Sequence, residues 1–291
     1  MSAMPTPETL RAIRRIYERR TLRDLGEKTW RLARERLCGV DRSIFDKTRA
    51  YYRDAKGQEI SRQEALARAL DKARHKSAWF ARERRSVEEI MAFYREVEVY
   101  PFRQPLNKRF GGFRWYVRLV GHIDRPSILE YGCGSAVLTE WLIERFPRCR
   151  YTVADIPSTT LEFVKWKQAR YASPYRVLTI GAGKAGIPLD EPYDLIICQD
   201  VLEHTPNPLE IAASFIDHLS VGGVLIVDFL NAPGGENLQA AVEQRQAVKR
   251  LLSEALIPLK AIDVPSRSDG LYVKGPGAVR EPGALAAAAG S

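Results

Sequence analysis

Two glycines and the acid before them stand where a chain could hold a charged ligand. Gly132 and Gly134 follow the apolar run 127–131, and an amphipathic stretch begins at Val137. Glycines between a strand and a helix let the backbone approach a ligand with no side chain in the way. A nicotinamide-binding turn would carry a third glycine at position 137, and Glu130 would repel a pyrophosphate. The Glu130 carboxylate instead suits a ligand that carries a positive charge.

Two further segments should line the same site. Asp155 ends the next apolar run, and an acid about 20 residues beyond such a turn is placed to accept hydrogen bonds from ribose hydroxyls. Residues 198–204 (CQDVLEH) follow the fourth apolar run and should form the opposite wall. Within them His204 is the first candidate for a general base, because histidine titrates near neutral pH. Glu203 is the second candidate.

The elements that must position these residues begin near residue 115, where apolar runs alternate with amphipathic stretches. Such runs, separated by helices, predict a parallel sheet that is covered on both faces. The last two runs, 260–264 and 270–274, are joined by too short a turn for parallel strands, so they should pair antiparallel. The predicted fold class is α/β: a doubly wound, mostly parallel sheet with one antiparallel strand, preceded by an α-helical N-terminal region.

The first 110 residues show helical rather than strand patterns. Ile13 and Tyr17 share one face of a helix, and Ser61 with Glu64 forms a capping box. The segment 96–113 is expected to be an irregular connector that packs over the cleft, with Tyr100 and Arg103 closing over the ligand. The chain is therefore divided into a helical lid or dimerisation region (1–110), an α/β domain (111–275) and a disordered tail (276–291).

Charge and composition narrow the classes of partner. Residues 1–110 hold 27 Lys and Arg against 16 Asp and Glu, whereas the remainder is near neutral. This asymmetry fits nucleic acid, an anionic substrate, an acidic protein surface or a solvated helical face. The four cysteines form no CxxC pair and no zinc pattern, so reduced thiols and no metal site are expected. With no apolar run of about 20 residues and no secretory signal, we expect a cytoplasmic protein without membrane contact.

Residues 114–275 resemble the class I (Rossmann-like) S-adenosylmethionine-dependent methyltransferases. The segment 130–134 (EYGCG) is similar to their first motif, Asp155 to the acid that ends their second strand, and 200–204 (DVLEH) to their segment after the fourth strand. The resemblance implies S-adenosylmethionine as the cofactor and a seven-stranded sheet. The residues that it implies for cofactor binding are Glu130, Gly132, Cys133, Gly134, Asp155, Ile156 and Gln199.

The resemblance also implies a role for each part of the site. Glu130 and the glycines would line the methionine end, Asp155 would hold the ribose, Ile156 would pack on adenine, and Gln199 would offer backbone contacts. The chain departs from the family pattern at Ala136, where a third glycine is frequent. It also lacks an acid in 181–184, after the third strand, which leaves the adenine contacts open.

The expected reaction is methyl transfer to an oxygen, nitrogen or carbon nucleophile of a small molecule by in-line displacement. Positioning alone can supply about 7–11 kcal/mol of such a barrier, so a general base is optional. No Asn-Pro-Pro-aromatic segment follows the fourth strand, and no Pro-Cys pair is present, so methylation of nucleobases is not indicated. The alternatives are a methyltransferase that grips RNA or protein through the basic N-terminal region, and a partner subunit without turnover. A homodimer formed through the helical N-terminus is a further expectation.

Overall fold

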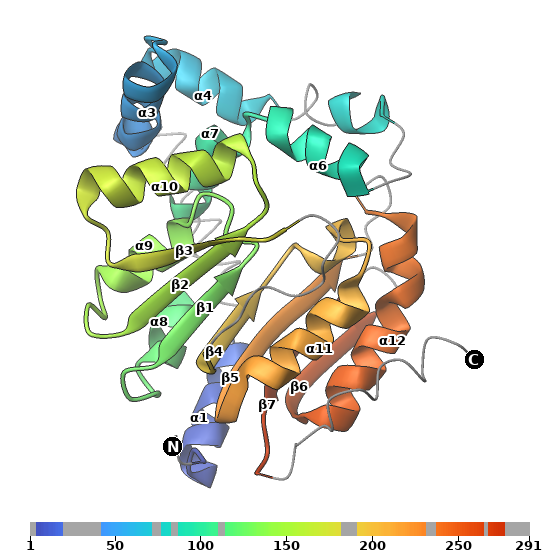
Figure 1. The fold of residues 1–291 in the computed structure, drawn as a ribbon. Coiled ribbons are helices and arrows are strands. Elements are labelled where there is room, and N and C mark those ends of the chain that lie inside the picture. The colour runs from blue at the N-terminus through green and yellow to red at the C-terminus, as the bar shows by residue number, and fades with distance from the viewer. Residues whose placement is uncertain are drawn as a thin grey trace.

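The computed structural model describes residues 4–19, 42–71, 77–82, 87–109, 114–181, 191–230, 237–264 and 267–276. Its centre is a seven-stranded sheet with the strand order β3-β2-β1-β4-β5-β7-β6 (Figure 1). The strands span Ser127–Tyr131 (β1), Arg150–Asp155 (β2), Tyr175–Thr179 (β3), Tyr193–Cys198 (β4), Leu219–Leu230 (β5), Ile257–Val264 (β6) and Arg267–Val273 (β7).

The direction of the strands confirms the predicted fold class. Strands β1 to β5 pair in parallel, whereas β7 runs antiparallel to both of its neighbours, β5 and β6. The strand order reverses between β1 and β4, because the chain fills one side of the sheet with β2 and β3 before it returns with β4. Ligands bind beyond the carboxyl ends of the strands at such a reversal.

Helices cover both faces of the sheet because its strands are apolar on both sides. In β4, Leu195 and Ile197 belong to one apolar cluster, whereas Ile196 and Cys198 belong to another. Helices α11 and α12 cover the second cluster, and α1, α8 and α9 cover the first. These helices and α10 span Pro7–Glu18 (α1), Arg114–Val120 (α8), Val137–Ile143 (α9), Thr159–Tyr171 (α10), Pro208–His218 (α11) and Gln239–Ala255 (α12).

Helix α1 packs against the sheet domain. Ile13 and Tyr17 are buried, as the apolar face predicted from the sequence requires. The Tyr17 ring meets Trp115 of α8 edge-on, with 5.6 Å between the ring centroids, and α1 also contacts β6. The first described helix is therefore anchored to elements that lie far from it along the chain.

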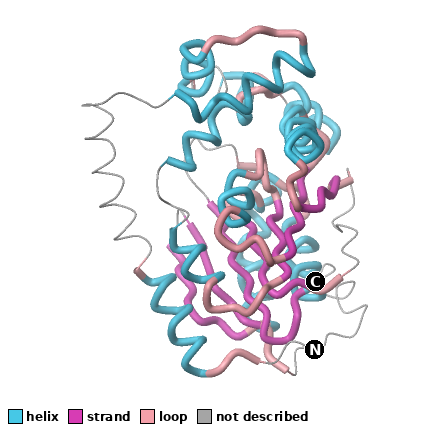
Figure 2. Tube along the Cα trace, turned by 90° about the vertical axis from the view of Figure 1, so that its left-hand side faces the viewer, coloured by secondary structure: helices cyan, strands magenta, loops and turns pink. Residues whose placement is uncertain are grey.

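The described residues between 42 and 109 form a second layer, which we call the cap. It lies beyond one end of the strands (Figure 2). Its elements are η1 (Arg42–Phe45), α3 (Asp46–Lys56), α4 (Arg62–Leu70), a helical turn at 77–80, α6 (Val87–Glu96) and α7 (Tyr100–Arg109). Ser61 caps α4 as predicted, since its hydroxyl accepts a hydrogen bond from the Glu64 amide at 3.1 Å. An aromatic cluster that includes Tyr51 and Phe163 joins the cap to α10.

The prediction of an irregular connector at 96–113 was wrong over α7. This helix contains Pro105, which lacks the N–H that would bond the carbonyl of Pro101 one turn earlier. The buried hydroxyl of Thr48 donates to that carbonyl instead, at 2.7 Å. Phe102 is buried against Tyr52, with 4.8 Å between their rings. A hydrogen bond and a ring contact from distant residues therefore stabilise a helix that the local sequence disfavours.

Two further expectations, a protein without membrane contact and a disordered tail, stay predictions. None of the helices in the described ranges is long and apolar enough to cross a membrane. The predicted disordered tail at 276–291 lies outside the described residues, apart from Pro276 at its start.

Candidate active site

A cavity of about 570 Å³ lies beyond the carboxyl ends of β1, β2 and β4 and beneath the cap. The strand ends form its floor, and residues of α6 and α7 form its roof. The nine residues that the sequence indicated all line this one cavity; they are Glu130, Gly132, Cys133, Gly134, Asp155, Ile156, Gln199, Glu203 and His204. The structure thus brings together residues that are more than 70 positions apart in the chain.

The glycine turn (residues 132–135) requires its two glycines. Gly132 has φ +69° and Gly134 has φ +51°, which side chains disfavour. A Cβ at position 132 would overlap Val201, and one at 134 would overlap the side chain of Gln104. The amides of Gly132 and Cys133 both donate to the carbonyl of Ala154 at the end of β2, at 2.8 and 3.1 Å. The turn is therefore held in place by the neighbouring strand.

Asp155 bridges the glycine turn and the end of β2. One carboxylate oxygen accepts from the Gly134 amide at 2.6 Å, and the other accepts from the Ile156 amide at 2.7 Å. Burial raises the pKa of Asp155 to about 6, although these two hydrogen bonds favour the ionised form. Each carboxylate oxygen keeps a further lone pair, so the predicted contact with ribose hydroxyls fits this geometry.

Glu130 lies close to the start of α9. Its carboxylate accepts hydrogen bonds from both the amide (3.1 Å) and the hydroxyl of Thr139. Burial raises the pKa of Glu130 to about 7; the Thr139 hydrogen bonds lower it, and the charge of Asp155 raises it further. A cationic group bound above the turn would favour the ionised form of this carboxyl group.

The loop after β4 is fixed by a buried acid on β5. Asp228 accepts from the Asp200 amide at 2.6 Å and from the Gln199 side chain at 3.2 Å. These contacts hold Asp200 at φ +54°, an unusual backbone conformation for a residue with a side chain. Within the described part of the chain, no group of three His, Cys, Asp or Glu residues could hold a metal ion.

Glu203 and His204 lie side by side in a short 3₁₀ turn, η2 (Leu202–His204). Glu203 is only 1% exposed, and burial raises its pKa to about 9, so it keeps its proton at neutral pH. One of its oxygens has no hydrogen-bond partner among the described residues. His204 Nε2 lies 3.9 Å from the other Glu203 oxygen, and the His204 ring meets Trp79 of the cap edge-on.

The roof of the cavity supplies residues that sequence reasoning only partly found. Tyr100 and Arg103 of α7 line the cavity, as expected, and Tyr94 of α6 and Gln104 of α7 join them. The Gln104 carbonyl oxygen accepts from both the amide and the hydroxyl of Ser135, at 2.5 and 2.7 Å. A prediction of helix over 100–109 would have placed Gln104 on the same turn as Arg103. The sequence did not indicate that helix, because Pro105 disfavours one.

The residues of the cavity fit the cofactor that the glycine turn implies. Two glycines present backbone rather than side chains at the wall, Asp155 offers acceptors for sugar hydroxyls, and Glu130 offers a negative charge. Ile156 and Ile180 add apolar surface to the wall of the cavity. A ligand with a sugar, an apolar ring and a positive charge is complementary to this set.

Comparisons with known proteins agree with this geometry. Residues 129–225 match the family model described as "Methyltransferase domain". The malonyl-[acyl-carrier protein] O-methyltransferase of Bacillus cereus is 24% identical over 45% of this chain and 47% of its own length. The trans-aconitate 2-methyltransferase of Streptomyces coelicolor is 29% identical over 44% and 43%, and the ubiquinone biosynthesis O-methyltransferase of Hydrogenovibrio crunogenus is 23% identical over 55% and 67%. The chain spans about half the length of the curated relatives it matches.

Solved structures show the same fold. An O-methyltransferase family protein from Burkholderia thailandensis superposes with a TM-score of 0.50 at 11% identity, over 75% of each chain. The sheet order, the reversed strand and the glycine turn define a class I, Rossmann-like fold. Residues 129–225 are thus similar to a methyltransferase domain, and the sheet that they belong to has the class I, Rossmann-like fold.

The cofactor assignment predicts a large effect of substituting Asp155. Asp155→Ala removes the proposed ribose acceptor and the contact with the Gly134 amide, so the affinity for S-adenosylhomocysteine should fall at least about tenfold, which corresponds to ~1.4 kcal/mol. Isothermal titration calorimetry measures this change. Asp124→Ala is the control, because the Asp124 side chain is 93% exposed. Unchanged affinity in a folded Asp155→Ala protein would show that the ribose binds elsewhere.

The three buried acids predict that the ligand-free protein loses stability as the pH rises. Their pKa values in the folded state, about 6 (Asp155), 7 (Glu130) and 9 (Glu203), lie above the reference values of 3.8 and 4.5. The folded state therefore binds more protons than the unfolded state. The resulting stability, fully present below about pH 4, is lost as the pH rises through the folded-state values.

Denaturant unfolding between about pH 5 and pH 9 measures this loss. Each group contributes a slope of at most about 1.4 kcal/mol per pH unit. Glu203→Gln keeps the shape of the side chain and cannot ionise, so its free energy of unfolding should depend less on pH above about pH 7. Identical slopes for Glu203→Gln and the parent chain would contradict the assignment of a buried, protonated Glu203.

Proposed function

We propose that this protein transfers a methyl group from S-adenosylmethionine to a small molecule enclosed between the cap and the strand ends. The observation that carries the proposal is the roof of the cavity, where Tyr94, Tyr100 and Arg103 of the cap face the cofactor wall. A cavity of about 570 Å³ suits a small ligand. Two of the relatives are named for trans-aconitate and for ubiquinone biosynthesis, which supports an acceptor of this size.

The bound cofactor would supply an electrophilic methyl group, and the chain would position the reactants. We assign the amino-acid end of the cofactor to Glu130 and the glycine turn, the ribose to Asp155, and the adenine to Ile156. The Gln199 backbone would contact the adenine side from the β4 loop. The cap excludes water from the cavity and orients the acceptor, and such positioning lowers the barrier without any covalent step on the protein.

His204 is the proposed general base for an acceptor that must lose a proton. It lines the cavity beyond β4, with its side chain 23% exposed. Glu203 is less suited to accept a proton, because burial raises its pKa to about 9 and it already carries one at neutral pH. The sequence-based choice of His204 over Glu203 is thus supported by their different burial.

Ion pairing in the cap favours the small molecule over RNA or protein as the acceptor. Several basic residues of the cap already pair with acids, as in Arg62 with Asp46 and Lys56 with Glu162. Paired charges are less available to a phosphate backbone, which binds mainly through Lys and Arg. A homodimer through residues 1–110, a cytoplasmic location and the three-part division of the chain stay predictions.

Transfer of a labelled methyl group tests the proposal. S-adenosylmethionine labelled on its methyl carbon is incubated with the protein and with either a low-molecular-mass metabolite fraction or purified RNA and protein. We expect label in the low-molecular-mass products, because a cavity of about 570 Å³ beneath the cap suits a small acceptor. Asp155→Ala is the control. Label confined to RNA or protein would favour the alternative acceptor, and no transfer despite S-adenosylhomocysteine binding would indicate a subunit without turnover.

The role of His204 is separable from cofactor binding. His204→Ala should lower kcat by about 10²–10⁴-fold, the usual contribution of a general base, while the Kd of S-adenosylhomocysteine stays within about twofold. The turnover of this variant should recover partly at higher pH, where the acceptor loses its own proton. Glu203→Gln is the matched control and should keep most of the activity at neutral pH. Full activity of His204→Ala would assign His204 to the structure of the η2 turn.

A further inference from the structure

Ser135, the last residue of the glycine turn, has every polar group engaged by residues outside the turn. It is fully buried. Its amide and its hydroxyl donate to Gln104 of the cap, and its carbonyl accepts from Lys167 Nζ at 2.6 Å. The position of Ser135 therefore depends on one cap side chain and on one buried lysine of α10. Ser135 directly follows Gly134, whose amide donates to Asp155.

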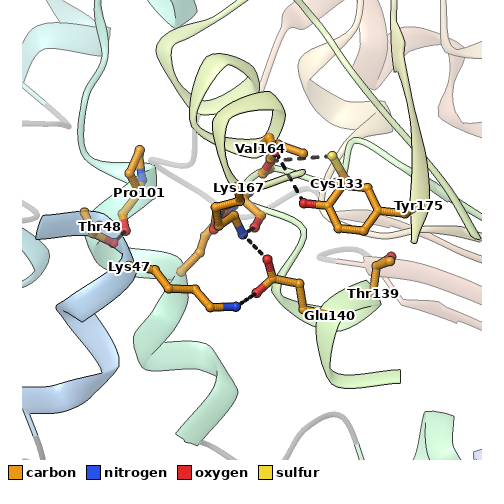
Figure 3. A network of polar contacts seen from close by, with 12 residues as sticks. Lys47, Thr48, Pro101, Cys133, Thr139, Glu140, Val164, Lys167 and Tyr175 are labelled. Carbon is orange, nitrogen blue, oxygen red and sulfur yellow. Dashed lines mark hydrogen bonds and ion pairs between the residues drawn. The ribbon is translucent and has the colours of Figure 1, made fainter. Parts of the chain in front are cut away.

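Lys167 belongs to a chain of charges that reaches the cap. Lys167 is 2% exposed, and its amino group lies 2.7 Å from one oxygen of Glu140 on α9. The other Glu140 oxygen pairs with Lys47 on helix α3 of the cap, at 3.1 Å. Figure 3 shows the Glu140 carboxylate between the two amino groups. Burial disfavours the charge on Glu140, but the two lysines outweigh it and lower the pKa of Glu140.

Lys47, Ser135, Glu140 and Lys167 do not line the cavity. Lys167 contacts the wall of the cavity through the backbone of the glycine turn, and its charge also lowers the pKa of Glu130. Removing one partner of a buried ion pair is destabilising, because the other charge is left without compensation. If Lys47 leaves Glu140, the Glu140–Lys167 pair and the bond to the Ser135 carbonyl are free to adjust. The packing of the cap and the shape of the turn are consequently linked by three successive contacts: Lys47 with Glu140, Glu140 with Lys167, and Lys167 with the Ser135 carbonyl.

We propose that Lys167 is a positioning residue for the glycine turn, and that Lys47 of the cap strengthens cofactor binding through Glu140 and Lys167. This inference rests on the proposed function, since it assigns the turn to S-adenosylmethionine. The cap then does more than cover the cavity. Its arrival over α9 tightens the turn that holds the cofactor, and a bound cofactor in return favours the closed cap, because such coupling is reciprocal.

A second ion pair provides a matched comparison. Lys56 also lies on α3 and pairs with Glu162 on α10, at 2.9 Å. Lys47 and Lys56 are similarly placed at the surface, with side chains 47% and 31% exposed. Glu162 accepts hydrogen bonds from Tyr51 and Lys56 of the cap. Among the described residues, it forms no hydrogen bond or ion pair with Lys167 or Ser135. Both pairs join the cap to the sheet domain, and only the Lys47 pair leads to the glycine turn.

Calorimetric titration of S-adenosylhomocysteine into four variants tests the inference. Lys167→Met should weaken binding roughly tenfold and Lys47→Met about threefold, as coupled neighbours in one network do. Lys56→Met should bind within about twofold of the parent chain, and Lys47→Arg should restore the affinity that Lys47→Met loses. Thermal unfolding without ligand is the second readout. Lys47→Met should unfold at a lower temperature than Lys56→Met, because Lys47 pairs with Glu140, which is 12% exposed, whereas Lys56 pairs with Glu162, which is 61% exposed.

The possible results separate this inference from the proposed function. If the parent chain itself does not bind S-adenosylhomocysteine, the proposed function fails. If the parent binds and Lys47→Met binds equally well, or Lys47→Met and Lys56→Met lose the same affinity, the coupling through Glu140 is overturned. A folded Lys167→Met protein with the parent affinity overturns the role of Lys167. Should Lys167→Met fail to fold, the comparison between Lys47→Met and Lys56→Met decides.

Discussion

The binding of the glycine turn to the end of β2 is the contact on which the rest of the site depends. Two consecutive amides of the turn donate to the Ala154 carbonyl, and the amide that follows them, that of Gly134, donates to Asp155. The turn can follow this path only because Gly132 and Gly134 have positive φ angles. The path brings Glu130, Asp155 and the start of α9 around one cavity. Without it, the carboxyl ends of β1 and β2 would be ordinary strand ends.

The site gathers three acids, for which the described residues show no ion pair with a lysine or an arginine. Glu130, Asp155 and Glu203 are each shifted toward the protonated form by burial, which raises their pKa values. Removing a carboxyl group from water is costly unless a partner compensates it. A cationic ligand beneath the cap would compensate the first two. Strongly shifted acids gathered in one cavity are typical of functional sites.

The cap depends on contacts between residues far apart in the chain. Helix α7 accommodates Pro105 because Thr48 bonds the carbonyl that the proline leaves without a partner. The same helix presents Arg103 and Gln104 to the cavity. Lys47 on α3 pairs with Glu140 on α9, which pairs with Lys167 on α10, so these contacts connect the cap with the cofactor wall (Figure 3). Side-chain contacts therefore join the cover of the cavity to the glycine turn.

The sequence by itself determined the sheet, its reversed strand, the glycine turn and the placement of Asp155. These features have local signatures: apolar runs of strand length, glycines between a strand and a helix, and a spacing imposed by the intervening helix. The tertiary structure alone decided that residues 100–109 form a helix, that Gln104 and Lys167 hold Ser135, and that Asp228 fixes the loop after β4. Each of these side-chain contacts joins residues at least 28 positions apart. No local pattern records such a pairing, because it depends on where the folded elements meet.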